Sequence, residues 1–203
     1  MIQKINFRDQ IRGHILQKLQ SGQLKLNDTL SLAELARELN VSTTPIREAL
    51  SQLQYSKIIE AIPNRGFRIP PLDDQEARNL YTLLGTLEHM VILQANYDGR
   101  SINRLRKANA AFVKAESALA RINADLHFHA ELIAPSENDY ACQIITDIKT
   151  RVFFYEVKFM EDKALQPISN HHHQEIIAAL EAGDSLKAAE LTKDNWDLSQ
   201  KVI

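Results

Sequence analysis

The chain has 203 residues, of which 44% are hydrophobic and 25% are charged, the composition of an ordinary folded protein. No apolar run reaches the roughly 18 residues of a membrane-spanning helix, so no such helix is expected. A single cysteine, Cys142, excludes an internal disulfide. The N-terminus is amphipathic and charged, unlike a secretion signal, so we expect a cytoplasmic protein.

The net charge of −2 is unevenly distributed along the chain. Residues 1–71 carry a net charge of +4, whereas residues 72–203 carry −6. A basic module joined to an acidic one suggests that a polyanion binds the first module only.

Helical periodicity dominates the first module. Apolar residues at three- and four-residue spacing predict helices at about 6–21, 32–39 and 45–55. Ser31 and Glu34 form a capping box that opens the second helix. Thr44 is a candidate cap for the third helix, with Pro45 at its first position.

The period then changes to that of short strands. Residues 58–62 and 67–69 are β-prone and flank a turn, which predicts a two-stranded hairpin. Pro70-Pro71 closes the module, so the predicted boundary gives domains 1–71 and 72–203. Two helices joined by a tight turn and followed by a hairpin predict a winged helix-turn-helix.

The start of the second helix of such a pair can enter the major groove of double-stranded DNA. Arg47 could contact a guanine there through two hydrogen bonds, while the wing could reach a minor groove. The alternative for Arg47 is an ion pair with Glu48 or Glu38. The predicted DNA-binding residues are Ser42, Thr43, Thr44, Arg47, Asn64, Arg65 and Gly66.

Beyond Pro71 the sequence is helical throughout, which predicts an all-α bundle. The predicted helices span about 73–97, 101–118, 121–134, 138–163, 168–182 and 184–200. Asp73, Ser101 and Asp184 are plausible N-caps, and Gly183 is a plausible helix terminator.

Two helices of this bundle carry candidate metal ligands. Asp125 and His129 are four residues apart and share a helical face, and His173 lies in a later helix. One carboxylate and two imidazoles suit a divalent transition metal. On spacing alone, a surface hydrogen bond between Asp125 and His129 is the stronger alternative.

The first module resembles the GntR family of bacterial regulators. The resemblance rests on the runs Leu32–Ala36 and Val41–Leu50 and on the wing tip around Gly66. It implies operator binding. Thr43 replaces an arginine that usually contacts DNA, and Lys57 replaces a glycine that commonly precedes the wing.

The second module resembles the FadR-type C-terminal domain, called FCD, in its six-helix, VanR-like variant. Asp125 to His129, and the stretch from His173 to Ala188, carry the resemblance. Metal-binding FCD domains use one Asp and three His, which implies Asp125, His129 and His173 as ligands. The fourth position falls on Asn195, whose neutral oxygen would weaken Zn²⁺ or Ni²⁺ binding and favour Mn²⁺ or Mg²⁺.

The resemblance also implies a small-molecule effector. Many FCD domains hold a carboxylate ligand through an arginine, but Leu84 occupies that position here. Arg151 and Lys158 are the substitute cations that we expect to bind an effector such as an organic acid.

The sequence therefore predicts a homodimeric, ligand-responsive transcription regulator, with repression the expected direction, a divalent metal (Zn, Ni or Mn) and no enzymatic activity. Two alternatives use the same Asp/His/His site. One is a metal-dependent hydrolase, with Glu175 as the neighbouring base. The other is a sensor of the metal ion itself. A further alternative is a winged domain used only for protein contacts.

Overall fold

The computed structural model describes residues 7–63, 65–161 and 166–200, and the chain divides into two compact units, Met1–Leu72 and Asp73–Ile203. The protein is mainly helical with one small sheet, which confirms the predicted fold class. Among the described residues, no helix combines the length and the apolar character needed to cross a membrane. Each unit is described separately.

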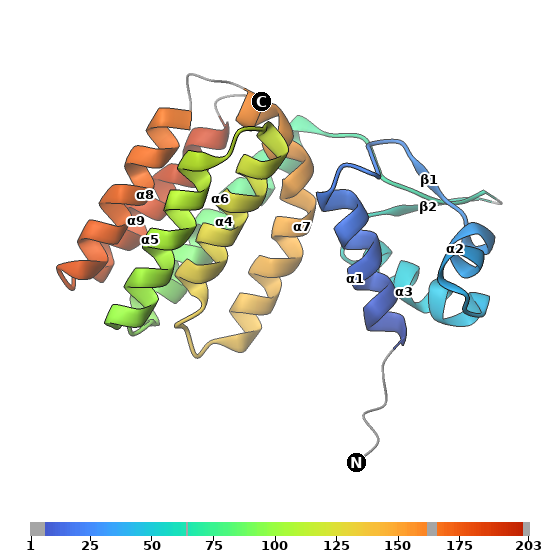
Figure 1. Ribbon diagram of the computed structural model, residues 1–203, viewed down its shortest axis with the longest axis horizontal. Coiled ribbons are helices and arrows are strands. Elements are labelled where there is room, and N and C mark those ends of the chain that lie inside the picture. Colours follow the sequence, from blue (N-terminus) through green and yellow to red (C-terminus); the bar gives the residue numbers. More distant parts are fainter. Residues whose placement is uncertain (1–6, 64, 162–165, 201–203) are drawn as a thin grey trace, which may run out of the picture. The chain divides into compact units, whose positions relative to one another are not determined.

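The first unit is a helical cluster with a small sheet (Figure 1). Its elements are α1 (Phe7–Gln20), β1 (Thr29–Leu30), α2 (Leu32–Leu39), α3 (Thr43–Tyr55), β2 (Glu60–Ile62) and β3 (Gly66–Arg68). α3 packs against both α1 and α2. Its apolar face is fully buried at Ile46, Ala49, Leu50 and Leu53.

The sheet has three antiparallel strands in the order β1-β3-β2. The hairpin of β2 and β3 was predicted, but β1 was not, because two residues are too short to show a strand period. β1 pairs Leu30 with Phe67, which ties the start of the helix pair to the wing.

The helix caps of this unit match the predictions in part. Ser31 accepts a hydrogen bond from the Glu34 amide, and Asn40 ends α2 in a left-handed conformation. The prediction of Thr44 as the cap of α3 is wrong. The helix already begins at Thr43, and the extended residue before it, Ser42, is the N-cap.

Two wing positions require unusual backbone angles. Lys57 has φ of +57°, which explains why a glycine is favourable there. Gly66 has φ of +91°, and a Cβ built on it would lie 2.6 Å from the carbonyl oxygen of Leu30. The approach of β3 to β1 therefore depends on Gly66 having no side chain.

The second unit is a bundle of helices (Figure 1). They are α4 (Asp74–Gln94), α5 (Gly99–Lys114), α6 (Ala118–Ile133), α7 (Asp139–Glu161), α8 (Gln166–Glu181) and α9 (Ser185–Ser199). α4 packs on α7 and α9, α6 packs on α5 and α7, and α8 packs on α5 and α9. Both α6 and α8, which carry the predicted metal ligands, therefore line the interior.

Side chains at the helix starts set the boundaries of this bundle. Asp73 and Asp184 cap α4 and α9 as predicted, and Gly183 follows α8 with φ of +74°. The prediction of Ser101 as an N-cap is wrong. Asp98 caps α5, and Ser101 is the third helical residue of a capping box, where its Oγ accepts a hydrogen bond from the Asp98 amide.

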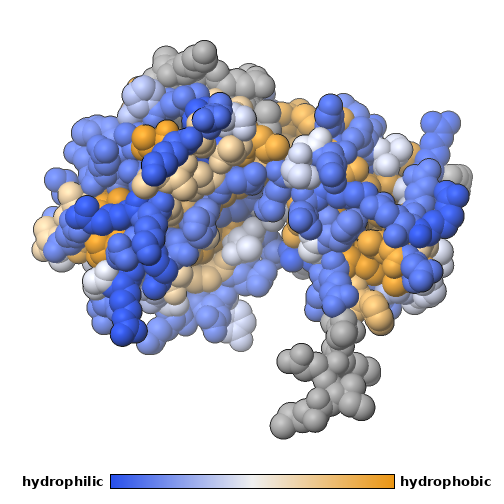
Figure 2. Space-filling view, in the orientation of Figure 1, coloured by the Kyte–Doolittle hydropathy of each residue, from blue (hydrophilic) through white to orange (hydrophobic). Residues whose placement is uncertain are grey.

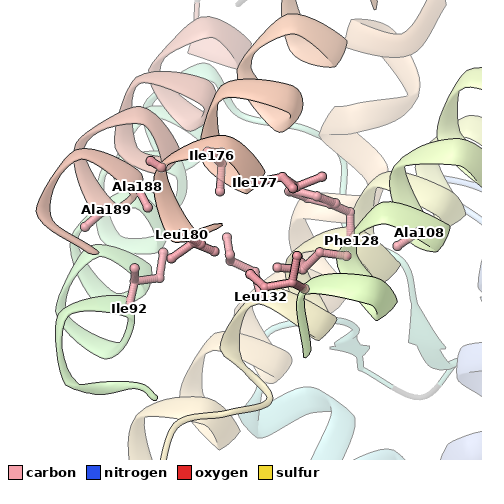
Figure 3. Close-up of a cluster of buried hydrophobic side chains, with 12 residues drawn as sticks. Ile92, Ala108, Phe128, Leu132, Ile176, Ile177, Leu180, Ala188 and Ala189 are labelled. Atoms are coloured by element: carbon pink, nitrogen blue, oxygen red, sulfur yellow. The ribbon is translucent and has the colours of Figure 1, made fainter. Parts of the chain in front are cut away.

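An apolar cluster fills one part of this bundle, between α4, α5, α6, α8 and α9 (Figure 3). On the surface, in contrast, hydrophilic residues cover most of the face shown in Figure 2, and smaller hydrophobic areas lie between them. Phe128 belongs to this apolar cluster and also stacks on His173, which is part of the polar site described below. The cluster consists of Ile92, Ile102, Leu105, Ala108, Phe128, Leu132, Ile176, Ile177, Ala179, Leu180, Ala188 and Ala189.

Gly66→Ala should destabilise the first unit by about 1–3 kcal/mol, because alanine is strained at this φ and collides with Leu30. Gly13→Ala is the matched control, since nothing lies within 4 Å of its added Cβ and α1 should gain about 0.5–1 kcal/mol. Urea unfolding followed by far-UV circular dichroism measures both changes. Equal stability of the two variants would contradict the close approach of β1 and β3.

Candidate functional site

Three buried side chains converge inside the second unit. Asp125 and His129 come from α6 and His173 from α8, and one ligand atom from each lies within 4.8 Å of the others. Their exposed fractions are 3%, 0% and 0%. The structure thus brings together the three predicted ligands in the interior, so the surface hydrogen bond considered as an alternative does not describe this pair.

The ring of His173 is fixed from two sides. Phe128 stacks on it with ring centroids 3.9 Å apart, and Asn109 Oδ1 lies 3.1 Å from Nδ1. Asn109 donates its amide to Asn170, so its oxygen faces the ring and accepts the Nδ1 proton. The lone pair is then on Nε2, 3.3 Å from Asp125 Oδ1. Burial lowers the pKa of His173, which keeps the ring neutral and able to bind a metal.

His129 is held by a carboxylate that sequence analysis did not single out. Its Nδ1 lies 2.7 Å from Oε2 of Glu88, which is completely buried. A carboxylate accepts the Nδ1 proton, and this leaves the Nε2 lone pair directed into the site. Glu88 therefore fixes both the tautomer and the orientation of a predicted ligand.

Glu88 is itself held by two donors. Lys149 approaches Oε1 to 2.5 Å, and Trp196 Nε1 donates to Oε2 over 2.7 Å. Burial alone would raise the pKa of Glu88, but the charges and hydrogen bonds of Lys149 and His129 lower it to about 2. The Glu88 carboxylate is therefore ionised near neutral pH, and the ammonium group of Lys149 balances its charge inside the bundle.

Asn195 on α9 lies where the fourth ligand is expected. Its Nδ2 is 3.2 Å from His129 Nε2, and its Oδ1 has no hydrogen bond. A half-turn of the amide exchanges these two atoms and would present the oxygen to the site. The structure thus places the Asn195 side chain beside His129, one of the three clustered residues.

The donor set fits a divalent metal. Asp125 Oδ1, His173 Nε2 and Asn195 Oδ1 are buried atoms without a hydrogen bond within the described part of the chain. Buried polar atoms normally have partners, and a cation would satisfy all three. One carboxylate, two imidazoles and an amide oxygen suit Mn²⁺ or Zn²⁺, with water completing the shell.

The sequence contains a pattern that indicates Glu88 and Lys149, the two residues that the motif analysis missed. Glu88 lies in a helix whose buried face also includes Leu84 and Val91, at spacings of four and three. Lys149 likewise lies four residues after the buried Ile145. Charged residues at core positions of two helices indicate a buried ion pair, and the pattern could have been read as such.

Of the two cations predicted to bind an effector, the structure describes the side chain of Arg151. Arg151 is buried and bonded to Glu76 Oε2 through Nε and Nη2, at 3.1 and 2.6 Å. Glu76 also accepts from Tyr155. Arg151 therefore links the start of α4 to α7. The side chain of Lys158 lies outside the described residues.

The predicted DNA-binding residues of the first unit are accessible. Ser42, Thr43, Thr44 and Arg47 are exposed at the start of α3, and Arg65 is exposed between β2 and β3. Asn64 lies outside the described residues, and Gly66 begins β3.

The alternative ion pair of Arg47 is not formed. Within the described ranges Arg47 makes no ion pair, and Glu38 binds Lys18 and His14 instead. Arg68 is paired across the hairpin with Glu60. Of these two cations, Arg47 is therefore the one that presents a charge to a partner.

Comparison with known proteins identifies both units. Residues 7–69 match the family described as bacterial regulatory proteins, gntR family, and residues 79–197 match the FCD domain. The HTH-type transcriptional repressor GlaR of Escherichia coli is 22% identical over 196 residues, which cover 86% of this chain and 85% of that protein.

Solved structures show the same fold. A crystal structure of a GntR-type protein from Rhodococcus sp. RHA1 matches with a TM-score of 0.78 and 18% identity, over 96% of this chain and 95% of that one. Escherichia coli McbR/YncC matches with a TM-score of 0.76 and 20% identity, over 94% and 93% of the two chains.

Lys149→Met should destabilise the second unit by about 3–5 kcal/mol, because it leaves Glu88 buried without its cation. Adding Glu88→Gln removes the orphaned charge, so the double variant should be more stable than Lys149→Met alone. Trp196, the only tryptophan, reports the unfolding by fluorescence. A single variant as stable as the wild type would show that Lys149 does not neutralise Glu88.

Proposed function

We propose a function from the premise that this chain belongs to the GntR family of bacterial regulatory proteins, in the group whose second domain is an FCD domain. Members of the family are transcription regulators that bind operator DNA and respond to a small molecule through the FCD domain. In our proposal, this protein represses transcription and senses its effector through a divalent metal held by Asp125, His129, His173 and Asn195. The buried Asp/His/His cluster is the observation that carries the proposal.

The DNA-binding part of the proposal rests on exposure and charge. Arg47 projects from the first turns of α3 without an ion pair among the described residues, so it can contact base edges. The hydroxyls of Ser42, Thr43 and Thr44 surround the helix start, where phosphate contacts are favourable. The wing would add Asn64, Arg65 and Gly66 in a minor groove.

The sensing part rests on the metal site. An ion bound by three protein ligands, or a five- or six-coordinate ion bound by four, keeps at least one position for water or for an oxygen of an effector. A small molecule such as an organic acid would bind there, with Arg151 or Lys158 as an additional contact. Arg151 could do so only by giving up bonds to Glu76.

Binding changes DNA affinity only if the effector prefers one of two states of the protein. A coupling of about 1–3 kcal/mol, typical of allosteric proteins, would change operator affinity by 5- to 150-fold. We propose that the protein acts as a homodimer, because two winged units can then bind the two half-sites of a palindromic operator. A cytoplasmic location follows from contact with DNA.

The enzymatic alternative is not favoured. The family consists of transcription regulators, and Glu175, the base considered from the sequence, pairs with the exposed His171. Family membership equally disfavours a winged unit that serves protein contacts alone. A sensor of the metal ion itself uses the same ligands and would respond to metal without an organic molecule.

Arg47→Ala should abolish sequence-specific DNA binding, because each bidentate contact to guanine contributes about 1–3 kcal/mol of discrimination and the charge on α3 is lost as well. The measurement is a gel-shift titration on an operator selected from genomic fragments by the wild-type protein. Arg100→Ala removes an equal charge from the exposed start of α5 and is the matched control. Unchanged affinity of the Arg47 variant would contradict the assignment of α3 as the recognition helix.

Asn195→His should raise Zn²⁺ and Ni²⁺ affinity by at least about 10-fold, because it adds a third imidazole beside His129. Calorimetric titration of the metal-free protein measures the change, with His127→Asn, at an exposed position of α6, as control. A variant that binds Zn²⁺ no more tightly than the wild type would exclude Asn195 from the ligand set.

A further inference from the structure

Among the buried polar residues of the second unit, four helices carry a pair of side chains at spacings of four or seven that meet in the interior. Such spacings return to the same face of a helix. Each helix therefore contributes one residue to each of two polar layers, separated by one or two helical turns. The pairs are Tyr81 and Glu88 on α4, Asp125 and His129 on α6, Lys149 and Glu156 on α7, and Asn195 and Ser199 on α9.

The first layer is electrically balanced. Glu88 contacts both Lys149 and His129, and Asn195 contacts the other nitrogen of His129. The one full negative charge of this layer thus has a lysine beside it.

The second layer has two carboxyl groups and no such cation. Glu156 receives hydrogen bonds from Tyr81 and Ser199, and the charge of Asp125 acts on it. Within the described ranges, no lysine or arginine forms an ion pair with either carboxyl group. Both carboxyl groups are buried, and two buried carboxylates without a cation beside them are unfavourable. A cation near this layer would therefore stabilise it.

One oxygen of each carboxyl group is available for such a cation. Oδ1 of Asp125 and Oε1 of Glu156 are buried and have no hydrogen bond, and Glu156 is only 1% exposed. Glu156 is not part of the tight group in which the ligand atoms of Asp125, His129 and His173 lie within 4.8 Å of one another. Glu156 is therefore not a direct member of that ligand group, and it would act on an ion there from outside the group.

We propose that Glu156 is the second carboxylate of the metal site, accepting a hydrogen bond from a water bound to the ion. The inference rests on the proposed function, since it requires a metal at Asp125, His129 and His173. Glu156 would add a second negative charge beside that of Asp125, because histidine and asparagine bind metals as neutral ligands. The added negative charge and the water ligand that Glu156 would hold favour a harder ion, so the site should prefer Mn²⁺ more than an Asp/His/His set alone would.

The test is calorimetric titration of MnCl₂ and ZnCl₂ into the metal-free full-length chain, wild type beside Glu156→Gln. Glutamine has the same shape as glutamate, and its side-chain oxygen can still accept hydrogen bonds from the hydroxyls of Tyr81 and Ser199, so the variant should fold. We expect the Kd for Mn²⁺ to rise about 10- to 100-fold, the usual effect of losing an outer partner of a metal site. The Kd for Zn²⁺ should rise less, and the melting temperature without metal should not fall.

Glu131→Gln is the matched control, because this carboxylate lies on α6 with the ligands but pairs with Arg104 at the surface. It should leave both Kd values unchanged. Glu156→Gln with wild-type Mn²⁺ affinity would overturn the inference alone, provided that Asp125→Asn still abolishes binding. A wild-type chain that binds neither ion would overturn the metal site of the proposed function together with the inference.

Discussion

The ion pair between Glu88 and Lys149 is the interaction on which the second unit depends. Bringing a carboxylate and an ammonium into a helical core is unfavourable unless each meets the other and further hydrogen bonds are made. Glu88 meets this condition through Lys149, His129 and Trp196. The result is a rigid carboxylate that orients His129, so the chemistry of the site is set by a pair that contacts no ion itself.

The two units use their polar residues in opposite ways. In the winged unit the functional groups face outward, and Arg47 projects from a helix whose other face is completely buried. In the helical unit they face inward, where a cation would be the strongest local charge. A regulator needs both arrangements, because DNA must find its contacts on a surface, whereas a small effector is recognised best where water is excluded.

Much of the fold was predictable, because periodicity and capping are local properties. The helices of both units, the hairpin and caps such as Asp73 follow from such patterns. β1 could not be predicted, because a two-residue strand is too short to show a period. The start of α3 at Thr43 could not be predicted either, because three adjacent hydroxyl residues are all suitable caps. Asp125 and His129 share a face by spacing alone, but their meeting with His173, and the support of Glu88, depend on how distant helices pack.

The central claim is that the helical unit holds a divalent ion in its core. Elemental mass spectrometry of the untagged protein, wild type beside His173→Ala, tests it most directly. The account predicts about one ion per chain in the wild type, with water completing the shell, and loss of that ion in the variant. A wild-type protein without metal, after incubation with Mn²⁺ or Zn²⁺ and removal of the excess, would contradict it.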